Sequence, residues 1–218
     1  MKRLAQQFEH DGRLAELLDD FQPRPGQLKL AQRISECLAS GTDLVAEAAT
    51  GTGKTLAYLL PALVGSDKVI ISTGTLNLQD QLFGRDLPLA LKAAGVEKSV
   101  ALLKGRANYL CPQRMDKAED GPGTLDLEAR EHLDLVRRWS RQTTTGEIRE
   151  LAGIPERARI WPLVTSNVDN CLGSECPRIN DCPVLKARRR AQDADVVVVN
   201  HHLLFADLAL KQTGFGEV

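Results

Sequence analysis

The segment Ala48-Ala49-Thr50-Gly51-Thr52-Gly53-Lys54-Thr55 decides how the rest of the sequence is interpreted. It fits the Walker A phosphate-binding pattern except at Ala48, where the general pattern has a glycine. Its two glycines permit backbone conformations that turn successive N–H groups towards phosphate oxygens, and the helix predicted over residues 54–64 presents its positive N-terminal end to them. A Gly-x-Gly alone also occurs in ordinary strand-to-helix turns, but with Lys54 and Thr55 after it phosphate binding is favoured.

Strand and helix patterns alternate on both sides of this loop. One helix is predicted over residues 27–38, ended by Gly41, and another over 76–87. Short apolar runs predict strands at residues 43–47, 68–72, 99–103 and 195–200. Because strands that alternate with helices form a parallel sheet covered on both faces, the sequence predicts an α/β fold.

The alternation stops between residues 104 and 191. This stretch contains a predicted helix over 125–142 and a part rich in proline and cysteine. The simplest account is a small module inserted between two strands of one α/β domain. The module is too polar and proline-rich to build an apolar core of its own, so we expect its folding to depend on ligation by its cysteines.

Composition limits the class of protein. The 218 residues carry a formal net charge of -1, so total charge gives no sign of nucleic-acid binding, and 43% hydrophobic with 26% charged residues indicates a folded globular protein. No apolar stretch suits a secretory signal or a membrane span, so we expect a cytoplasmic protein without membrane contact. In that reducing compartment, five cysteines indicate metal or cluster ligation rather than disulfides.

Four of the cysteines form a candidate metal centre. Cys111, Cys171, Cys176 and Cys182 are separated by 59, 4 and 5 residues, and three of them precede proline. Four thiolates suit a [4Fe–4S] cluster or a Zn²⁺ ion. The absence of a Cys-x-x-Cys knuckle and the Cys-Pro junctions favour the cluster only modestly, and zinc stays open. The fifth, Cys37, is expected on a buried helix face.

Several segments resemble the XPD-like iron–sulfur helicases of superfamily 2, of the DinG/YoaA type, with YoaA most similar. Residues 21–27 look like the Q-motif region, and residues 71–82 are similar to motif Ia. Residues 104–111, 161–164 and 170–173 look like sequences of the family's cluster domain. The resemblance covers nearly the whole chain, and helicases of this superfamily often carry alanine at the position of Ala48.

The resemblance implies a fold and an activity. Residues 1–103 and 192–218 would form a RecA-like helicase domain 1, and residues 104–191 a small, mainly helical iron–sulfur domain inserted in it. The protein would be an ATP-dependent 5′–3′ DNA helicase of DNA repair or replication, carrying a [4Fe–4S] cluster and using ATP with Mg²⁺. It would act as a monomer on single-stranded and forked DNA, with a replication-polymerase accessory subunit as a further partner.

The motifs and the resemblance together name the site residues. Lys54 is predicted to reach the β- and γ-phosphates and the Thr55 hydroxyl to ligate Mg²⁺. The predicted nucleotide contacts are Gln27, Ala48, Ala49, Thr50, Gly51, Thr52, Gly53, Lys54 and Thr55. The cluster ligands implied by the family are Cys111, Cys171, Cys176 and Cys182. The predicted DNA contacts are Thr73, Thr75, Gln79, Arg106, Tyr109, Arg188, Arg189 and Arg190.

Each contact has a plainer alternative. Gln27 suits a solvated helix residue, and the threonines at 73 and 75 suit helix N-caps. The arginines at 188–190 suit a solvated helix face about as well as phosphate contact, and Trp161 suits a core position better than a stacking platform. His201 follows the last strand and is interpreted as structural rather than as a metal ligand.

One element of a complete motor is not found. The chain contains no Asp-Glu dipeptide of a Walker B element, and residues 214–217 resemble the segment that precedes it in the family. We therefore expect an N-terminal part that alone neither hydrolyses ATP nor unwinds DNA. The competing hypotheses are a non-motor zinc or iron–sulfur module that binds nucleic acid, and a nucleotide-dependent switch.

Overall fold

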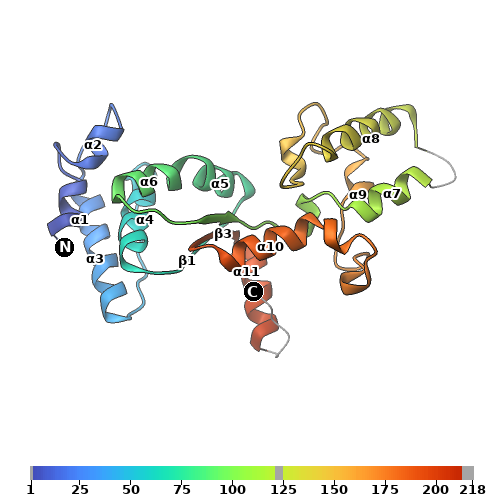
Figure 1. Ribbon diagram of the computed structural model, residues 1–218. Helices are drawn as coiled ribbons and strands as arrows, with labels where there is room; N and C mark the ends of the chain where they lie inside the picture. Colours follow the sequence, from blue (N-terminus) through green and yellow to red (C-terminus); the bar gives the residue numbers. More distant parts are fainter. Residues whose placement is uncertain (1, 121–124, 213–218) are drawn as a thin grey trace. The chain divides into compact units, whose positions relative to one another are not determined.

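The computed structural model describes residues 2–120 and 125–212, so the predicted segment at 214–217 lies outside the described residues. Contacts between residues divide the chain into two compact units. Figure 1 shows the chain coloured by position in the sequence. Unit 1 contains the chain up to Leu102 together with Ala194–Leu204, and unit 2 contains Leu103–Asp193 and the chain from Phe205. In sequence, unit 2 therefore interrupts unit 1.

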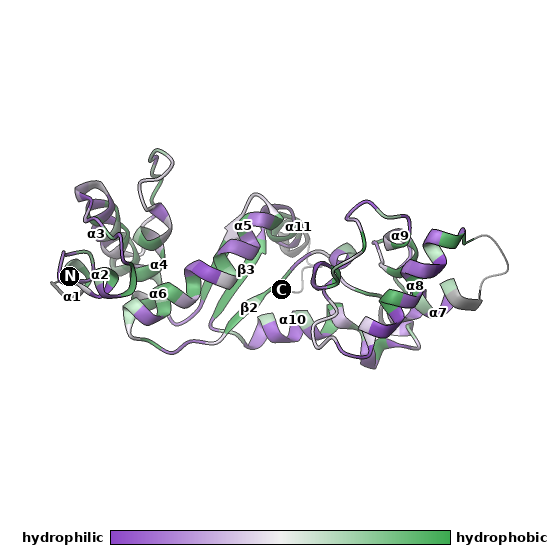
Figure 2. Ribbon diagram, turned by 90° about the horizontal axis from the view of Figure 1, so that it is seen from above, coloured by the Kyte–Doolittle hydropathy of each residue, from purple (hydrophilic) through white to green (hydrophobic). Residues whose placement is uncertain are grey.

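A parallel sheet organises unit 1. Its strands β1 (Val69–Thr73), β3 (Val196–Asn200) and β2 (Val100–Leu102) lie in the order β1-β3-β2. The central strand, β3, has its four valines buried because it pairs on both edges, and it is strongly hydrophobic in Figure 2. The predicted parallel α/β sheet is confirmed, including the return of residues 195–200 to it.

Helices cover this sheet and build the core of unit 1. Their bounds are α1 (Lys2–Gln7), α2 (Arg13–Leu17), α3 (Pro25–Ser40), α4 (Lys54–Gly65), α5 (Leu76–Gln81) and α6 (Leu87–Ala94). Helix α3 ends as predicted at Gly41, whose φ of 64° is the left-handed conformation favoured at a helix C-terminus. The core joins Leu59, Leu60 and Leu63 of α4 to β3.

The strand predicted over residues 43–47 is wrong. These residues form coil and are exposed, with Val45 fully so. A parallel strand needs a neighbour that exchanges backbone hydrogen bonds with it, and none of the described strands pairs with this segment. The short apolar run was therefore an insufficient signal without a pairing strand.

The helical pattern over residues 76–87 hides a local distortion. Between α5 and α6 the chain forms a π-helix, η1 (Leu82–Asp86), so the three pieces make one continuous helical run with a widened turn. Periodicity of apolar residues does not reveal such a turn, because one extra residue shifts the pattern only slightly.

Unit 2 is mainly helical. It contains the helices α7 (Pro112–Asp120), α8 (Leu127–Ser140), α9 (Trp161–Val164) and α10 (Pro183–Asp193), together with the short turns η2 (Arg106–Asn108), η3 (Ile148–Glu150), η4 (Gly173–Glu175) and η5 (Ile179–Asp181). The helix α11 (His201–Gln212) follows β3. Isolated antiparallel bridges join Tyr109 to Glu147 and Leu110 to Thr165, which fixes the backbone just before Cys111.

Unit 2 has an apolar core, which corrects the expectation that it is too polar to build one. The buried members include Leu133 and Val136 of α8 with Ile160, Trp161 and Val164 around α9. Trp161 is buried and its indole N–H donates to the carbonyl of Pro155 at 2.9 Å, so its core role is confirmed. None of the described helices is both long and apolar enough for a bilayer span.

Candidate functional site

The phosphate loop has the backbone that its sequence requires. Gly51 and Gly53 have φ values of 76° and 79°, in the left-handed region that favours glycine, and Lys54 is the first residue of α4. The loop thus leads directly into the N-terminus of a long helix, where unsatisfied N–H groups and the helix dipole favour an anion.

The Lys54 ammonium is held by the loop itself. It donates to the carbonyl of Ala48 and, at 2.7 Å, to that of Ala49. The Thr52 hydroxyl also donates to Ala49, at 2.8 Å. A bound phosphate would compete with these carbonyls for the Lys54 ammonium.

Side chains at the start of helix α3 hydrogen-bond to the phosphate loop. Gln27 is buried and its Nε2 donates to the carbonyl of Gly53 at 2.9 Å, so the alternative of a solvated helix residue is wrong. A methyl group at Gly53 would overlap the Gln27 amide. Arg24 donates through Nη1 to the carbonyl of Gly51. Sequence reasoning missed Arg24, although it lies in the same Q-motif-like run as Gln27.

A polar cavity of about 270 Å³ opens beside Thr55 at the carboxyl ends of β1 and β3. Tyr58, three residues after Thr55 on α4, also lines it. Burial, with a smaller contribution from the nearby Asp86 carboxylate, raises the pKa of Tyr58 to about 12. His201 also lines the cavity, and its Nδ1 lies 2.7 Å from the Ser72 hydroxyl, which fits the structural role expected for it.

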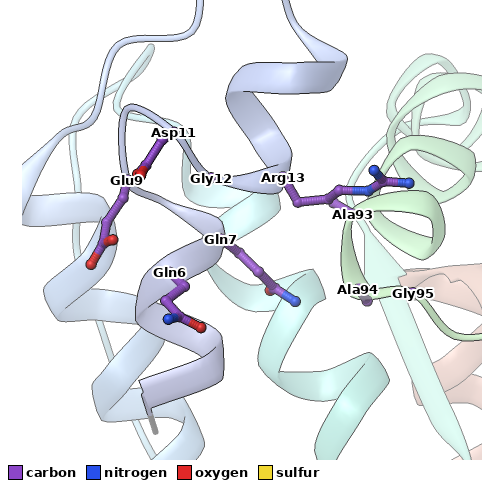
Figure 3. Close-up of a pocket in the computed structure, with 9 residues that line it drawn as sticks. All are labelled: Gln6, Gln7, Glu9, Asp11, Gly12, Arg13, Ala93, Ala94 and Gly95. Atoms are coloured by element: carbon purple, nitrogen blue, oxygen red, sulfur yellow. The ribbon is translucent and has the colours of Figure 1, made fainter.

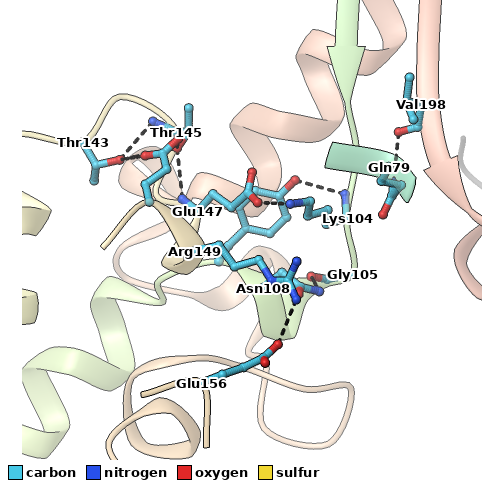
Figure 4. A network of polar contacts seen from close by, with 12 residues as sticks. Gln79, Lys104, Gly105, Asn108, Thr143, Thr145, Glu147, Arg149, Glu156 and Val198 are labelled. Carbon is cyan, nitrogen blue, oxygen red and sulfur yellow. Dashed lines mark hydrogen bonds and ion pairs between the residues drawn. The ribbon is translucent and has the colours of Figure 1, made fainter. Parts of the chain in front are cut away.

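The motif Ia candidates hold the start of α5. The Thr75 hydroxyl accepts from the N–H of Leu78 at 3.2 Å and caps the helix, and Thr73 donates to the Thr75 carbonyl. Gln79 is fully buried and its amide donates to Val198 of β3 at 3.4 Å (Figure 4). In this conformation Gln79 fixes α5 to the sheet rather than facing solvent.

All four predicted cluster cysteines line one cavity of unit 2, of about 510 Å³. Their thiols are free. The apolar part of the wall includes Leu110, Ile179 and Leu185. Within the described ranges, no three side chains of His, Cys, Asp or Glu gather closely enough to ligate a single metal ion. The donor set itself, four thiols around one partly apolar cavity, has the chemistry that an iron–sulfur cluster requires.

Both repulsion between thiolates and nearby positive charge act on the cysteines. Burial raises the pKa of Cys111, and the thiolates of Cys176 and Cys182 raise it further. Four cationic side chains line the same cavity, and they are Arg106, Arg114, Lys117 and Arg188. These cations would offset the negative charge of four thiolates, whereas the thiolates alone repel one another.

The remaining DNA candidates divide by exposure. Arg189 and Arg190 are exposed on α10, and Arg188 is half-buried beside the cysteines. Tyr109 is buried, and its hydroxyl accepts from the backbone N–H of Lys104 at 3.1 Å. Its ring therefore has no free face for stacking in this conformation.

A third cavity, of about 520 Å³, lies in unit 1 between the α1–α2 turn and the end of α6 (Figure 3). Its lining residues are Gln6, Gln7, Glu9, Asp11, Gly12, Arg13, Ala93, Ala94 and Gly95. None of these residues belongs to the phosphate loop or to the cysteine set, so the cavity is separate in composition from both candidate sites.

Comparisons with known proteins show which proteins the chain resembles. The DEAD/DEAH box helicase family matches residues 25–108. The ATP-dependent DNA helicase YoaA of Escherichia coli is 51% identical over 97% of this chain and 33% of its own length, and YoaA of Haemophilus influenzae is 47% identical over 99% and 34%. The helicase DinG of Photobacterium profundum is 36% identical over 90% and 31%. The chain spans about a third of the length of these curated relatives. By these matches, the chain is a homologue of YoaA and DinG over at least 90% of its length, and its residues 25–108 match the DEAD/DEAH box helicase family.

Proposed function

We propose that this chain is the ATP- and DNA-binding N-terminal part of an ATP-dependent 5′–3′ DNA helicase. The observation that carries the proposal is the phosphate loop. Gly51 and Gly53 adopt left-handed conformations, and Lys54 and Thr55 open a helix of 12 residues. This arrangement offers backbone N–H groups, an ammonium and a hydroxyl to a magnesium-bound triphosphate.

Nucleotide binding follows from the existing contacts. Lys54, which now donates to the carbonyls of Ala48 and Ala49, would donate to phosphate oxygens instead, and Thr55 would ligate Mg²⁺. Gln27 and Arg24 hold the carbonyls of the loop glycines, so their contribution is to fix the loop and, for Gln27, to read the nucleotide base. The bound Mg²⁺ supplies charge neutralisation at the β- and γ-phosphates.

The cysteine cavity is proposed to hold a [4Fe–4S] cluster on Cys111, Cys171, Cys176 and Cys182. Support comes from the four free thiols that share one cavity and from the homology to DinG and YoaA. When bound, the cluster supplies a cross-link between distant segments and a centre able to exchange one electron. A zinc-bound module remains the second candidate for this cavity.

The cluster proposal is tested on protein purified without oxygen. Wild type should be brown and contain about four iron atoms per chain, and Cys176→Ser should lose most of both. The matched control is Cys37→Ser, because Cys37 is buried on α3 in unit 1 and should leave the iron content unchanged. About one zinc per colourless chain would select the zinc module instead.

DNA is proposed to contact the polar start of α5 and the basic side chains of unit 2. The candidates are Thr75, Arg106, Arg188, Arg189 and Arg190, which bind phosphates without reading sequence. Thr73, Gln79 and Tyr109 are buried, so their proposed role is to support these contacts from behind. The substrates proposed for the whole protein are single-stranded and forked DNA, in repair or replication, with a polymerase accessory subunit as partner and a monomeric motor.

The helicase proposal is tested by DNA-stimulated ATP hydrolysis in the full-length protein. Lys54→Ala should reduce the rate at least about a hundredfold, because it removes the phosphate-binding ammonium. Lys29→Ala is the control, since Lys29 is an exposed residue of α3. Wild-type rates in Lys54→Ala would refute the motor. The 218-residue chain alone should bind nucleotide without turnover.

A further inference from the structure

The first residue after the central strand reaches across to the neighbouring strand. His201 begins α11 directly after β3, and β3 runs parallel to β1 with Asn200 opposite Thr73. The Nδ1 atom of His201 lies 2.7 Å from the hydroxyl oxygen of Ser72, a hydrogen bond between residues 129 positions apart. Because the Ser72 hydroxyl can both donate and accept, this bond forms whichever ring nitrogen carries the proton.

The same imidazole ring lies beside the turn that follows β1. A methyl group built on Gly74 would stand 3.7 Å from Cδ2 and 3.9 Å from Nε2 of His201, which are ordinary van der Waals distances. Ser72, Gly74 and His201 also line one cavity, the 270 Å³ cavity at the carboxyl ends of β1 and β3. His201 therefore restricts the turn at two positions.

This turn connects the sheet to the start of α5. Only Gly74 separates Thr73, the last residue of β1, from Thr75, the N-cap of α5. Thr75 is exposed, whereas Thr73 is buried and donates to the Thr75 carbonyl at 3.2 Å. Glycine allows many backbone conformations, so the turn depends on neighbouring contacts to hold a single one. The place of the exposed Thr75 hydroxyl thus depends on the side chains that restrain residues 72–74.

The contact made by His201 does not serve the apolar core. Its side chain is exposed, and the core of unit 1 is built from aliphatic and aromatic residues of the helices and strands. A side chain kept for packing alone would be expected to be buried. Ser72 precedes unit 2 in the sequence and His201 follows it, so the start of α5 receives this restraint only where the chain returns to the sheet.

We propose that His201 is a positioning residue for DNA binding, because it holds the turn that presents Thr75 at the start of α5. This inference rests on the proposed DNA contact of Thr75 and adds to it a residue that sets the affinity of that contact. The effect of His201 passes through Ser72 and Gly74.

The test measures binding of a fluorescein-labelled oligothymidine to the full-length protein by fluorescence anisotropy. His201→Ala should weaken binding about three- to tenfold, the effect of losing one hydrogen bond. His201→Asn keeps a hydrogen-bonding atom near the place of Nδ1 and should recover most of the affinity. Binding of a non-hydrolysable ATP analogue should equal that of wild type, because the hydrogen bonds described for the phosphate loop do not involve His201. A merely structural histidine would not separate the two ligands.

A second variant tests the hydrogen bond from its other end. Ser72→Ala should weaken DNA binding in the same direction, and the double variant His201→Ala/Ser72→Ala should be no weaker than His201→Ala alone, because both changes remove one bond. His202→Ala is the matched control. His202 is the exposed neighbour of His201 on α11 and is not among the residues that line the cavity, so its replacement should leave DNA affinity unchanged.

Hydrogen exchange reports on the turn without DNA. The N–H of Leu78 donates to the Thr75 hydroxyl at 3.2 Å, so its exchange rate follows the order of the start of α5. This amide should exchange about three- to tenfold faster in His201→Ala than in wild type, and at the wild-type rate in His202→Ala.

The outcomes separate this inference from the proposed function. Wild-type DNA affinity in His201→Ala, together with weakened binding in Thr75→Ala, would overturn the inference alone. Equal losses of DNA and nucleotide affinity in His201→Ala would also overturn it, since the residue would then support the fold in general. An asparagine variant as weak as the alanine variant would overturn the part of the Ser72 hydrogen bond. Unchanged DNA binding in Thr75→Ala would instead overturn the DNA contact on which the inference depends.

Discussion

Replacing Glu147 by glutamine should loosen the part of unit 2 that carries Cys111. The Glu147 carboxylate is ion-paired with Lys104 (Figure 4), and their side chains are only 14% and 0% exposed. Removing the charge of one partner from a buried pair commonly costs 3–5 kcal/mol, and glutamine keeps an acceptor oxygen, so we expect about 3 kcal/mol. The effect should be local, because the bridge between Tyr109 and Glu147 positions the backbone just before Cys111.

Hydrogen exchange measures this loss at a single amide. The N–H of Leu110 donates to the Gly146 carbonyl at 2.8 Å, directly beside Glu147. A loss of about 3 kcal/mol should speed its exchange by about a hundredfold. Glu156→Gln is the control, because Glu156 pairs with Arg149 at 2.8 Å with side chains 78% and 31% exposed, and it should change exchange by less than about fivefold.

Replacing both partners distinguishes the effect of an unpaired buried charge from the effect of a changed side-chain shape. Lys104→Met with Glu147→Leu substitutes apolar groups for the pair, and such replacements are often neutral or stabilising. We therefore expect the double variant to recover most of the protection at Leu110. Exchange in Glu147→Gln within about threefold of wild type, or a double variant less stable than the single one, would refute the reasoning.

Three further predictions concern glycines and a tyrosine. Gly53→Ala and Gly41→Ala both put a side chain on a residue in the left-handed conformation, but only Gly53→Ala also displaces the hydrogen-bonded amide of Gln27. In thermal unfolding, Gly53→Ala should therefore destabilise unit 1 by about 1 kcal/mol more than Gly41→Ala. Gly146→Ala should cost about 1–3 kcal/mol more than Gly153→Ala in urea unfolding, because only its methyl would meet a proline, at 2.6 Å. The pKa of Tyr58 is raised from 10.0 in the unfolded chain to about 12 in the folded protein. Between these two pH values the unfolded chain ionises first, so the free energy of unfolding should be unaffected below pH 10 and should fall as the pH rises towards 12. Tyr58→Phe should remove that part of the pH dependence.

The sequence predicted the elements whose signals are local. Helices α3 and α4 follow from apolar spacing and from glycines at their ends, and β3 follows from four consecutive valines. The run at 43–47 misled because a strand depends on a partner, which no local pattern contains. The π-helix was missed for a related reason, since its cause is a single extra residue within a helical pattern.

The candidate sites show the same division. The glycine conformations of the phosphate loop were predictable, because only glycine adopts positive φ readily. The contacts of Gln27 with Gly53 and of Arg24 with Gly51 join residues more than 20 positions apart, so only the fold reveals them.

The core of unit 2 changes what a cluster would be needed for. Leu133, Val136 and Ile160 pack together without any cysteine among them, so α8 and its neighbours have apolar burial of their own. The segment 167–182, by contrast, is mostly exposed and holds only two short 3₁₀ turns. It carries three of the four cysteines, so thiolate ligation would order this segment and fasten it to Cys111. Ligation and folding are thus expected to be coupled in the cysteine segment rather than throughout the unit.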